Sequence, residues 1–219
     1  MKCRILLVFV FSGLVFNAFG IDLSVGSGIS YSPLTSKWIF SNIGFEGTAT
    51  DHYNFGAINL YLDATYIQAI INYSYRFSGS YNSTGVFTGS GEYTNKETFL
   101  GVSILLKYPF VFGWFSFFPL VGIESDLNLS YTDKDGNDLK SGMPNAELDN
   151  LNKHFLKVGV GGNIKLSKRI YMSPVFIFGY KMPSRIEKNI EDYYWLNYGL
   201  TNRMRTTKFD IVFFAGYRL

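Results

Sequence analysis

Two histidines, His52 and His154, are the side chains best suited to acid–base chemistry near neutral pH. A catalytic histidine needs an oriented nucleophile within hydrogen-bond reach. Ser32, Asp51 and Ser130 are candidate partners, but no spacing in the sequence distinguishes any of them. The sequence therefore assigns no catalytic residue, and both histidines are expected to be solvated or to anchor the chain at an interface.

A second motif, Asp133-Lys134-Asp135-Gly136-Asn137-Asp138, copies the opening of a calcium-binding loop. A complete EF-hand loop has glycine at position six and a bidentate glutamate at position twelve. This segment has Asp138 and Pro144 at those positions, so the motif is incomplete. Asp-Gly and Gly-Asn pairs favour turns. The simpler interpretation is a polar hairpin tip, with weak surface calcium binding left open, and no metal site is assigned.

Three clustered glycines, Gly159, Gly161 and Gly162, are the nearest approach to a nucleotide-binding motif. They lie inside a predicted strand with no helix after it, so the context that such a motif requires is missing. We therefore expect no cofactor. The glycines are expected to relieve crowding inside a narrow structure.

The element that positions these residues is clearest in the last twelve residues, Lys208 to Leu219. Alternate residues form an apolar and aromatic set, which consists of Phe209, Ile211, Phe213, Ala215, Tyr217 and Leu219. A period of two places this set on one face of a strand. A soluble sheet would expose it as a sticky edge, whereas a transmembrane barrel needs an apolar face toward lipid and a mixed face inside.

Eight segments with this alternation are predicted, at 21–31, 55–62, 66–77, 98–108, 115–131, 155–166, 170–182 and 208–219. The connections between them alternate between long and short, and the long ones are 32–54, 78–96, 132–153 and 183–207. Outer-membrane barrels have short periplasmic turns and long outer loops. The predicted fold is all-β, an eight-stranded antiparallel up-and-down transmembrane β-barrel. The alternative is a soluble eight-stranded barrel of the lipocalin type, which would carry polar residues on its outer face.

The start of the chain predicts a cleaved signal peptide at residues 1–20, followed by one barrel domain at 21–219. Lys2 and Arg4 precede an apolar run, and Ala18-Phe19-Gly20 supplies small residues for cleavage. Without these two cations, 18 basic side chains face 17 acidic ones. This balance gives no reason to expect nucleic acid as a partner. No apolar run reaches about 18 residues, so a helical inner-membrane protein is disfavoured.

The predicted strands place two further groups of residues. Charged side chains are expected inside the barrel, in salt bridges because unpaired charges there are costly; the predicted set is Arg76, Lys107, Glu124, Asp126, Lys157, Lys165, Lys181, Asp210 and Arg218, together with Asp22, Asp63 and Lys208. Aromatic side chains are expected at the two membrane interfaces; this set is Tyr31, Tyr73, Tyr75, Tyr108, Trp114, Tyr131, Tyr180 and Tyr217. Pro119 is expected near the periplasmic rim or beside a bulge because proline donates nothing to a ladder.

With its leader, its eight alternating segments and its terminal strand, the chain resembles the small outer-membrane barrels of the OmpX, OmpA N-terminal and OmpW groups. The resemblance is architectural and includes no functional motif. It implies the outer membrane of a diderm bacterium as the location, with outer-membrane lipid and the barrel assembly machinery as partners. In these families a terminal aromatic residue usually guides assembly, whereas this chain ends in Leu219 with Tyr217 two positions earlier.

Three functions follow as hypotheses. The first is a non-enzymatic barrel that presents long loops rich in Tyr, Trp, Ser and Asn to an extracellular ligand. The second is a narrow, OmpW-like channel for small or hydrophobic solutes. An interior of eight strands is just wide enough to be filled by side chains, so an open porin is not expected. The third is an enzyme at the outer rim that modifies outer-membrane lipid.

Overall fold

The computed structural model describes residues 22–42, 45–85, 88–144, 148, 151–184, 187–189 and 201–219. The predicted signal peptide and most of the fourth long connection lie outside these residues. Among the described residues, no helix has the length and apolar character needed to cross a membrane.

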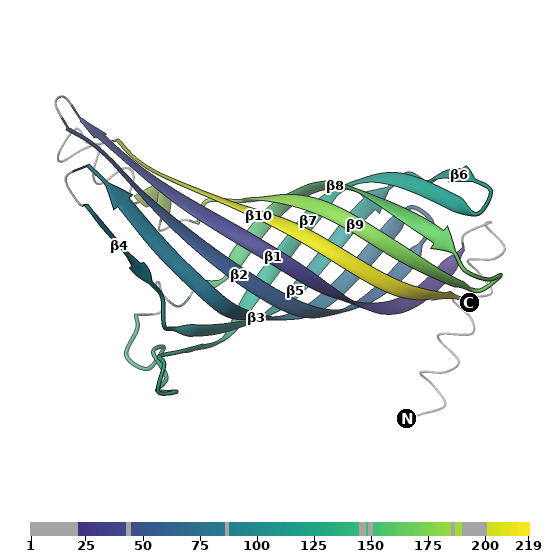
Figure 1. Ribbon diagram of the computed structural model, residues 1–219, viewed down its shortest axis with the longest axis horizontal. Coiled ribbons are helices and arrows are strands. Elements are labelled where there is room, and N and C mark those ends of the chain that lie inside the picture. Colours follow the sequence, from purple (N-terminus) through teal and green to yellow (C-terminus); the bar gives the residue numbers. More distant parts are fainter. Residues whose placement is uncertain are drawn as a thin grey trace.

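A single antiparallel sheet closes on itself to form a barrel (Figure 1). Its long strands are β1 (Leu23–Asn42), β2 (Phe45–Ala64), β3 (Ile67–Thr84), β5 (Lys96–Lys107), β7 (Phe115–Thr132), β8 (Lys153–Lys165), β9 (Ile170–Lys181) and β10 (Thr201–Arg218). Two short strands, β4 (Gly89–Glu92) and β6 (Phe110–Phe112), pair with β3 and β7. The first and last strands pair from Ser24–Arg218 to Ser41–Thr201, which closes the ring. The predicted fold class, an up-and-down antiparallel β-barrel, is confirmed.

The two faces of the barrel wall carry the residues that the alternation predicted for them. In β10, Phe209, Phe213 and Tyr217 are exposed on the outside. Lys208, Asp210 and Phe214, at the alternate positions, are buried inside. The same pattern gives Ile29 and Ile58, each 66% exposed, on the outside of β1 and β2. The outer wall is therefore apolar where a soluble barrel would be polar, which contradicts the lipocalin alternative.

The short connections and the described ends of the chain gather at one end of the barrel, which we call the inner end (Figure 1). Residues 65–66, 108–114 and 166–169 make these connections. The described parts of the long connections lie at the opposite, outer end (Figure 1). Pro119 lies close to the inner end. It is next to Leu120, the last residue of β7 at this end that pairs with β5.

The prediction of a long loop at 32–54 is wrong, because this segment is mostly strand. β1 continues to Asn42 and β2 begins at Phe45, and the two strands stay in register over this whole length. β3 likewise continues to Thr84, β4 pairs with it, and β10 begins at Thr201 rather than Lys208. Small polar residues made these segments resemble loops, although serine and threonine also fit a solvated strand.

The continued strands form a sheet that extends past one side of the barrel (Figure 1). We call it the outer sheet and define it as residues 34–42, 45–54, 78–84, 89–92 and 201–207, in the order β10-β1-β2-β3-β4. At about 3.3 Å per residue, the nine residues of β1 in this sheet span about 30 Å. The barrel thus carries a one-sided extension at its outer end.

Close strand contact limits the size of inward side chains at Gly122. A Cβ atom on this residue would lie 2.0 Å from the carbonyl oxygen of Ile104 and 2.8 Å from the Cα atom of Leu105. Both are backbone atoms of the neighbouring strand, so neither can move without distorting the wall. At Gly179, on β9, a Cβ atom would meet only side-chain carbon atoms at 3.5–3.6 Å.

We therefore expect Gly122→Ala to lower the free energy of unfolding by about 1–3 kcal/mol, the usual cost of overpacking. Gly179→Ala, its matched control, should change it much less. Urea unfolding of the barrel in lipid vesicles would measure both values. Equal values for the two variants would contradict the close approach of β5 and β7.

Candidate functional site

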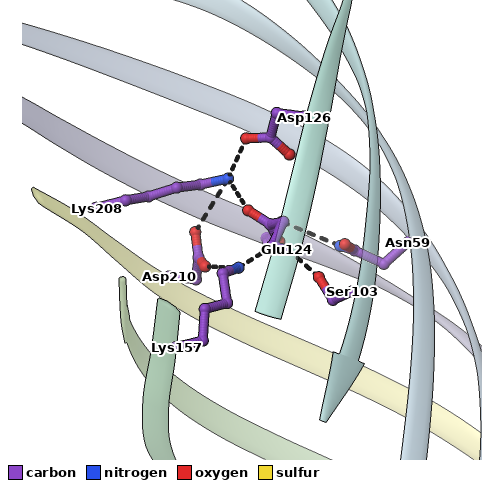
Figure 2. Close-up of polar contacts among 8 residues, drawn as sticks. Asn59, Ser103, Glu124, Asp126, Lys157, Lys208 and Asp210 are labelled. Atoms are coloured by element: carbon purple, nitrogen blue, oxygen red, sulfur yellow. Dashed lines mark hydrogen bonds and ion pairs between the residues drawn. The ribbon is translucent and has the colours of Figure 1, made fainter. Parts of the chain in front are cut away.

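A cluster of five charged side chains occupies the middle of the barrel interior (Figure 2). It contains Glu124 and Asp126 of β7, Lys157 of β8, and Lys208 and Asp210 of β10. Each residue is at most 6% exposed. Charges so deeply buried are tolerated only when they are paired and hydrogen bonded.

The two ammonium groups of this central ion cluster each bridge carboxylates (Figure 2). Lys208 Nζ lies 2.6 Å from Glu124 Oε1 and 3.0 Å from Asp126 Oδ2. Lys157 Nζ contacts Glu124 Oε2 and lies 2.6 Å from Asp210 Oδ2. Glu124 also accepts a 2.6 Å hydrogen bond from Ser103 Oγ. One glutamate therefore links strands β5, β7, β8 and β10 across the interior.

Two apolar clusters fill the interior on either side of the ion cluster. The inner apolar cluster comprises Tyr61, Ile70, Leu105, Phe118, Leu120, Tyr171, Val175, Ile177, Val212 and Phe214. The outer apolar cluster comprises Leu34, Phe55, Phe99 and Phe155, with Tyr53 against it. Lys208 Nζ lies 5.3 Å from the ring centre of Phe155, which joins the ion cluster to the outer apolar cluster.

The cavities that remain at the ion cluster are very small. One of about 20 Å³ is lined by Asn59, Glu124 and Asp210 among others, and one of about 10 Å³ lies beside Phe99 and Asp126. A single water molecule needs about 10–15 Å³ by the same measure. In the described part of the chain, the middle of the barrel is therefore filled by side chains.

The predicted interior charges outside the ion cluster form separate ion pairs nearer the two ends of the barrel. Lys107 lies 2.6 Å from Asp63 Oδ2 near the inner end, and Lys181 lies 2.5 Å from Glu187 near the outer end. Arg76 pairs with Glu97 at 3.4 Å, and this glutamate, which the sequence did not single out, also pairs with Lys153 at 3.7 Å.

Three of the predicted charges, Lys165, Arg218 and Asp22, lie at the inner rim instead. Lys165 is exposed and donates to the carbonyl of Gly113. Arg218 is half-buried and lies 3.6 Å from Asp22, which is exposed rather than inside the barrel. Strand ends protrude beyond the packed interior, which is why alternation alone placed these three side chains too deep.

A group of aromatic residues that the sequence did not single out lies at the base of the outer sheet. The rings of Tyr53 and Tyr93 are 5.3 Å apart, and Tyr81 lies 5.5 Å from Tyr93. The Arg76 guanidinium lies 5.1 Å from the Tyr53 ring centre, a distance typical of cation–π contacts. We call these three tyrosines and Arg76 the outer aromatic cluster. Alternation alone could not reveal it, because a bulge in β3 between Arg76 and Ser78 moves Tyr81 to the face of Arg76.

Tyr93 is held in this cluster by its hydroxyl group. It donates a 2.8 Å hydrogen bond to Asp51 Oδ1. Burial and then this hydrogen bond raise the pKa of Tyr93 to about 12. The hydroxyl therefore stays protonated, and remains a donor, throughout the physiological pH range.

Most of the predicted interface aromatics are exposed on the outer wall. Near the outer end these are Tyr31, Tyr73, Tyr75 and Tyr180, and near the inner end they are Tyr108, Trp114 and Tyr217. Tyr131 differs from its predicted position. A register shift at Thr98 and Phe99 pairs it with Glu97, whose carboxylate faces Arg76 inside the barrel. Cross-strand partners share a face, so the bulge turns Tyr131 toward the interior.

The two histidines lie on separate walls and do not form a common site. His52 Nδ1 is 3.1 Å from Thr35 Oγ1, and His154 Nδ1 is 2.9 Å from Ser125 Oγ. Both rings are exposed. Among the described residues, neither ring has a carboxylate partner that would orient it as a general base.

The calcium-like segment folds as a turn. The Asp133 carboxylate accepts hydrogen bonds from the backbone of Asp135 and Asn137 and from the Asn137 side chain. The Asn137 side chain contributes most to lowering the pKa of Asp133. Within the described ranges, no group of three His, Cys, Asp or Glu side chains is placed to hold a metal ion.

Comparison with known proteins finds similarity of fold only. No family model matches the sequence, and no curated protein matches it. Among solved structures, the chain is similar to the outer membrane protein OprG of Pseudomonas aeruginosa, with a TM-score of 0.43 and 12% identity over 90% of this chain and 95% of that one. It is also similar to Neisserial surface protein A, with a TM-score of 0.37 and 8% identity over 89% and 99% of the two chains.

A third similar structure is the outer membrane protease OmpT of Escherichia coli, with a TM-score of 0.36 and 7% identity over 90% of this chain and 97% of that one. These structural neighbours are outer-membrane β-barrel proteins, the group that the sequence resembles. At such low identity they carry no argument about activity, which must come from the residues of this chain.

We expect Lys208→Met to lower the free energy of unfolding by about 3–5 kcal/mol, because it leaves buried carboxylates with one ammonium group fewer. Lys165→Met, at the exposed rim, should change it by no more than about 0.5 kcal/mol. Urea unfolding in lipid vesicles would measure both. Adding Asp126→Leu to Lys208→Met should restore part of the loss. Equal effects of the two single changes would contradict the cluster.

Proposed function

We propose that this chain is an integral outer-membrane β-barrel whose outer sheet and outer connections bind ligands at the cell surface. The observation that carries this proposal is the combination of a filled interior with a sheet that extends from one wall. A filled barrel serves as an anchor, and an extended sheet offers a surface.

The outer wall supports the membrane location. Aliphatic residues such as Ile58, Leu60 and Ile104 are more than half exposed there, and exposed aromatic residues lie toward both ends. This arrangement is typical of a lipid-facing band between two interfaces. Outer-membrane lipid is therefore the expected partner of the wall, and β10 is the segment expected to be recognised by the barrel assembly machinery.

The filled interior favours an anchor over a channel. A solute crossing the barrel would have to displace the inner apolar cluster, the ion cluster and the outer apolar cluster in turn. The cavities between them are of about the size of one water molecule. No observation among the described residues specifically favours conduction, so the narrow channel remains the second hypothesis.

The outer sheet supports binding because one of its faces is aromatic. Trp38 and Phe40 lie on the same face of β1 as the buried Leu34, and their rings are stacked with centres 6.4 Å apart. The outer aromatic cluster lies on the same face of the outer sheet, closer to the barrel. Aromatic and arginine side chains are the types that contribute most to binding surfaces. The exposed histidines give no comparable support to a lipid-modifying enzyme.

The orientation can be tested with single cysteines, because Cys3 is the sole cysteine of the sequence and lies in the predicted leader. We expect Asn82→Cys and Ser90→Cys, on the outer sheet, to react with a membrane-impermeant maleimide in intact cells. Lys168→Cys, in the turn at the inner end, should react only after lysis. Labelling of Lys168→Cys in intact cells would contradict the proposed orientation.

Binding can be tested with Trp38→Ser and Phe40→Ser, combined in one variant, in bacteria that display the barrel. We expect this variant to lose adhesion to arrays of immobilised glycans and proteins that the unchanged barrel binds. Ile39→Ser, on the opposite face of β1, is the matched control and should retain adhesion. Equal adhesion by all three proteins would contradict the proposal, as would discrete conductance of the unchanged barrel in planar bilayers.

A further inference from the structure

The face of the outer sheet opposite to Trp38 carries two like charges side by side. Lys37 of β1 lies directly opposite Arg205 of β10, and both side chains are exposed. Facing residues of two strands have Cβ atoms about 4.5–5.5 Å apart, and like charges so placed destabilise a sheet. Among the described residues, no ion pair or hydrogen bond engages either side chain. We call these two residues the outer cation pair.

The three carboxylates of the outer sheet do not reach this pair. Asp51 is on the other face, where it accepts a hydrogen bond within the outer aromatic cluster. Glu46 lies opposite Ser41, about 13 Å farther along β1 than Lys37. Glu92 is on β4, which is separated from β1 by β2 and β3, a distance of about 14 Å. No carboxylate of the outer sheet therefore compensates the pair.

The outer cation pair lies on the lipid-facing side of the structure, above the aromatic band. Tyr31 precedes Lys37 by six residues on β1 and is exposed on the same face. Six residues of strand span about 20 Å, and a tilt of about 35–45° reduces this to about 15 Å along the membrane normal. A phospholipid headgroup region is only about 5–8 Å thick. The pair therefore lies at the level of the sugars that a glycolipid carries above its acyl chains.

We propose that the outer cation pair binds the phosphorylated sugars of an outer-leaflet glycolipid. A phosphate between the two side chains accepts hydrogen bonds from the ammonium and guanidinium groups and removes their repulsion. Thr50, which lies opposite Lys37 on β2, supplies a hydroxyl group at the same site. Bound in this way, the outer sheet keeps its aromatic face directed away from the lipid. The inference rests on the proposed orientation of the barrel, but it uses the opposite face of the sheet from the adhesion proposal.

The test uses the full mature chain, folded in neutral detergent micelles and labelled for NMR. The probes are rough lipopolysaccharide, the same lipopolysaccharide after chemical removal of its phosphates, and phosphatidylglycerol. We expect the phosphorylated glycolipid to shift the backbone amide signals of Thr50 and Thr206 at much lower concentration than the other two probes do. Lys37→Gln should weaken this binding about 5-fold, and Lys37→Gln combined with Arg205→Gln about 30-fold.

Lys37→Glu separates lipid binding from a structural role. It places opposite charges across β1 and β10, so we expect a higher urea midpoint of unfolding in phosphatidylcholine vesicles together with loss of glycolipid binding. Lys168→Glu, in the exposed turn at the inner end, is the matched control and should bind the glycolipid as the unchanged chain does.

Three outcomes would overturn the inference: no shift with any probe, equal binding of all three probes, or unchanged glycolipid binding by Lys37→Glu. Because both ends of the barrel are accessible in micelles, this result does not depend on the labelling test of orientation. Loss or retention of adhesion by the variant of Trp38 and Phe40 would likewise leave it unchanged.

Discussion

The pairing of β1 with β10 is the constraint on which the rest of the structure depends. A backbone in contact with hydrocarbon must satisfy its N–H and C=O groups within the protein, because no water is available there. An open sheet leaves two edges unsatisfied, whereas pairing the first strand with the last removes both. Once the ring is closed, alternate side chains can only point into lipid or into a narrow interior. The apolar wall and the filled, mixed interior are therefore both consistent with closure.

The narrow interior then determines how the charges are arranged. Eight strands enclose little more than the volume of their own side chains, and Gly122 marks where even a methyl group would collide with the neighbouring backbone. In so little space, the ammonium groups of Lys157 and Lys208 are each shared between carboxylates. Apolar clusters above and below keep water away from them. The interior thus consists of layers, which tie together strands that are far apart in the sequence.

The barrel could be predicted from the sequence because its signal is strictly local. In β10, Phe209 between Lys208 and Asp210 already identifies the outer and inner faces. The outer sheet escaped prediction because Ser36, Thr48 and Thr50 are residue types shared by loops and solvated strands. The bulge that turns Tyr131 inward depends on the register between two strands. The pairing of Glu97 with both Arg76 and Lys153 depends on side-chain positions that alternation cannot specify.

The pairing of β10 with β1, which we call the barrel seam, has a consequence for biogenesis. The outer sheet contains the pairing of β10 with β1, and β10 forms one edge of this sheet, with β2 and β3 on the far side of β1. A chain whose synthesis stopped early would lack an edge strand of that surface as well as the strand that seals the wall. Presentation of the complete surface is therefore coupled to the final step of assembly, so that only finished molecules can display it.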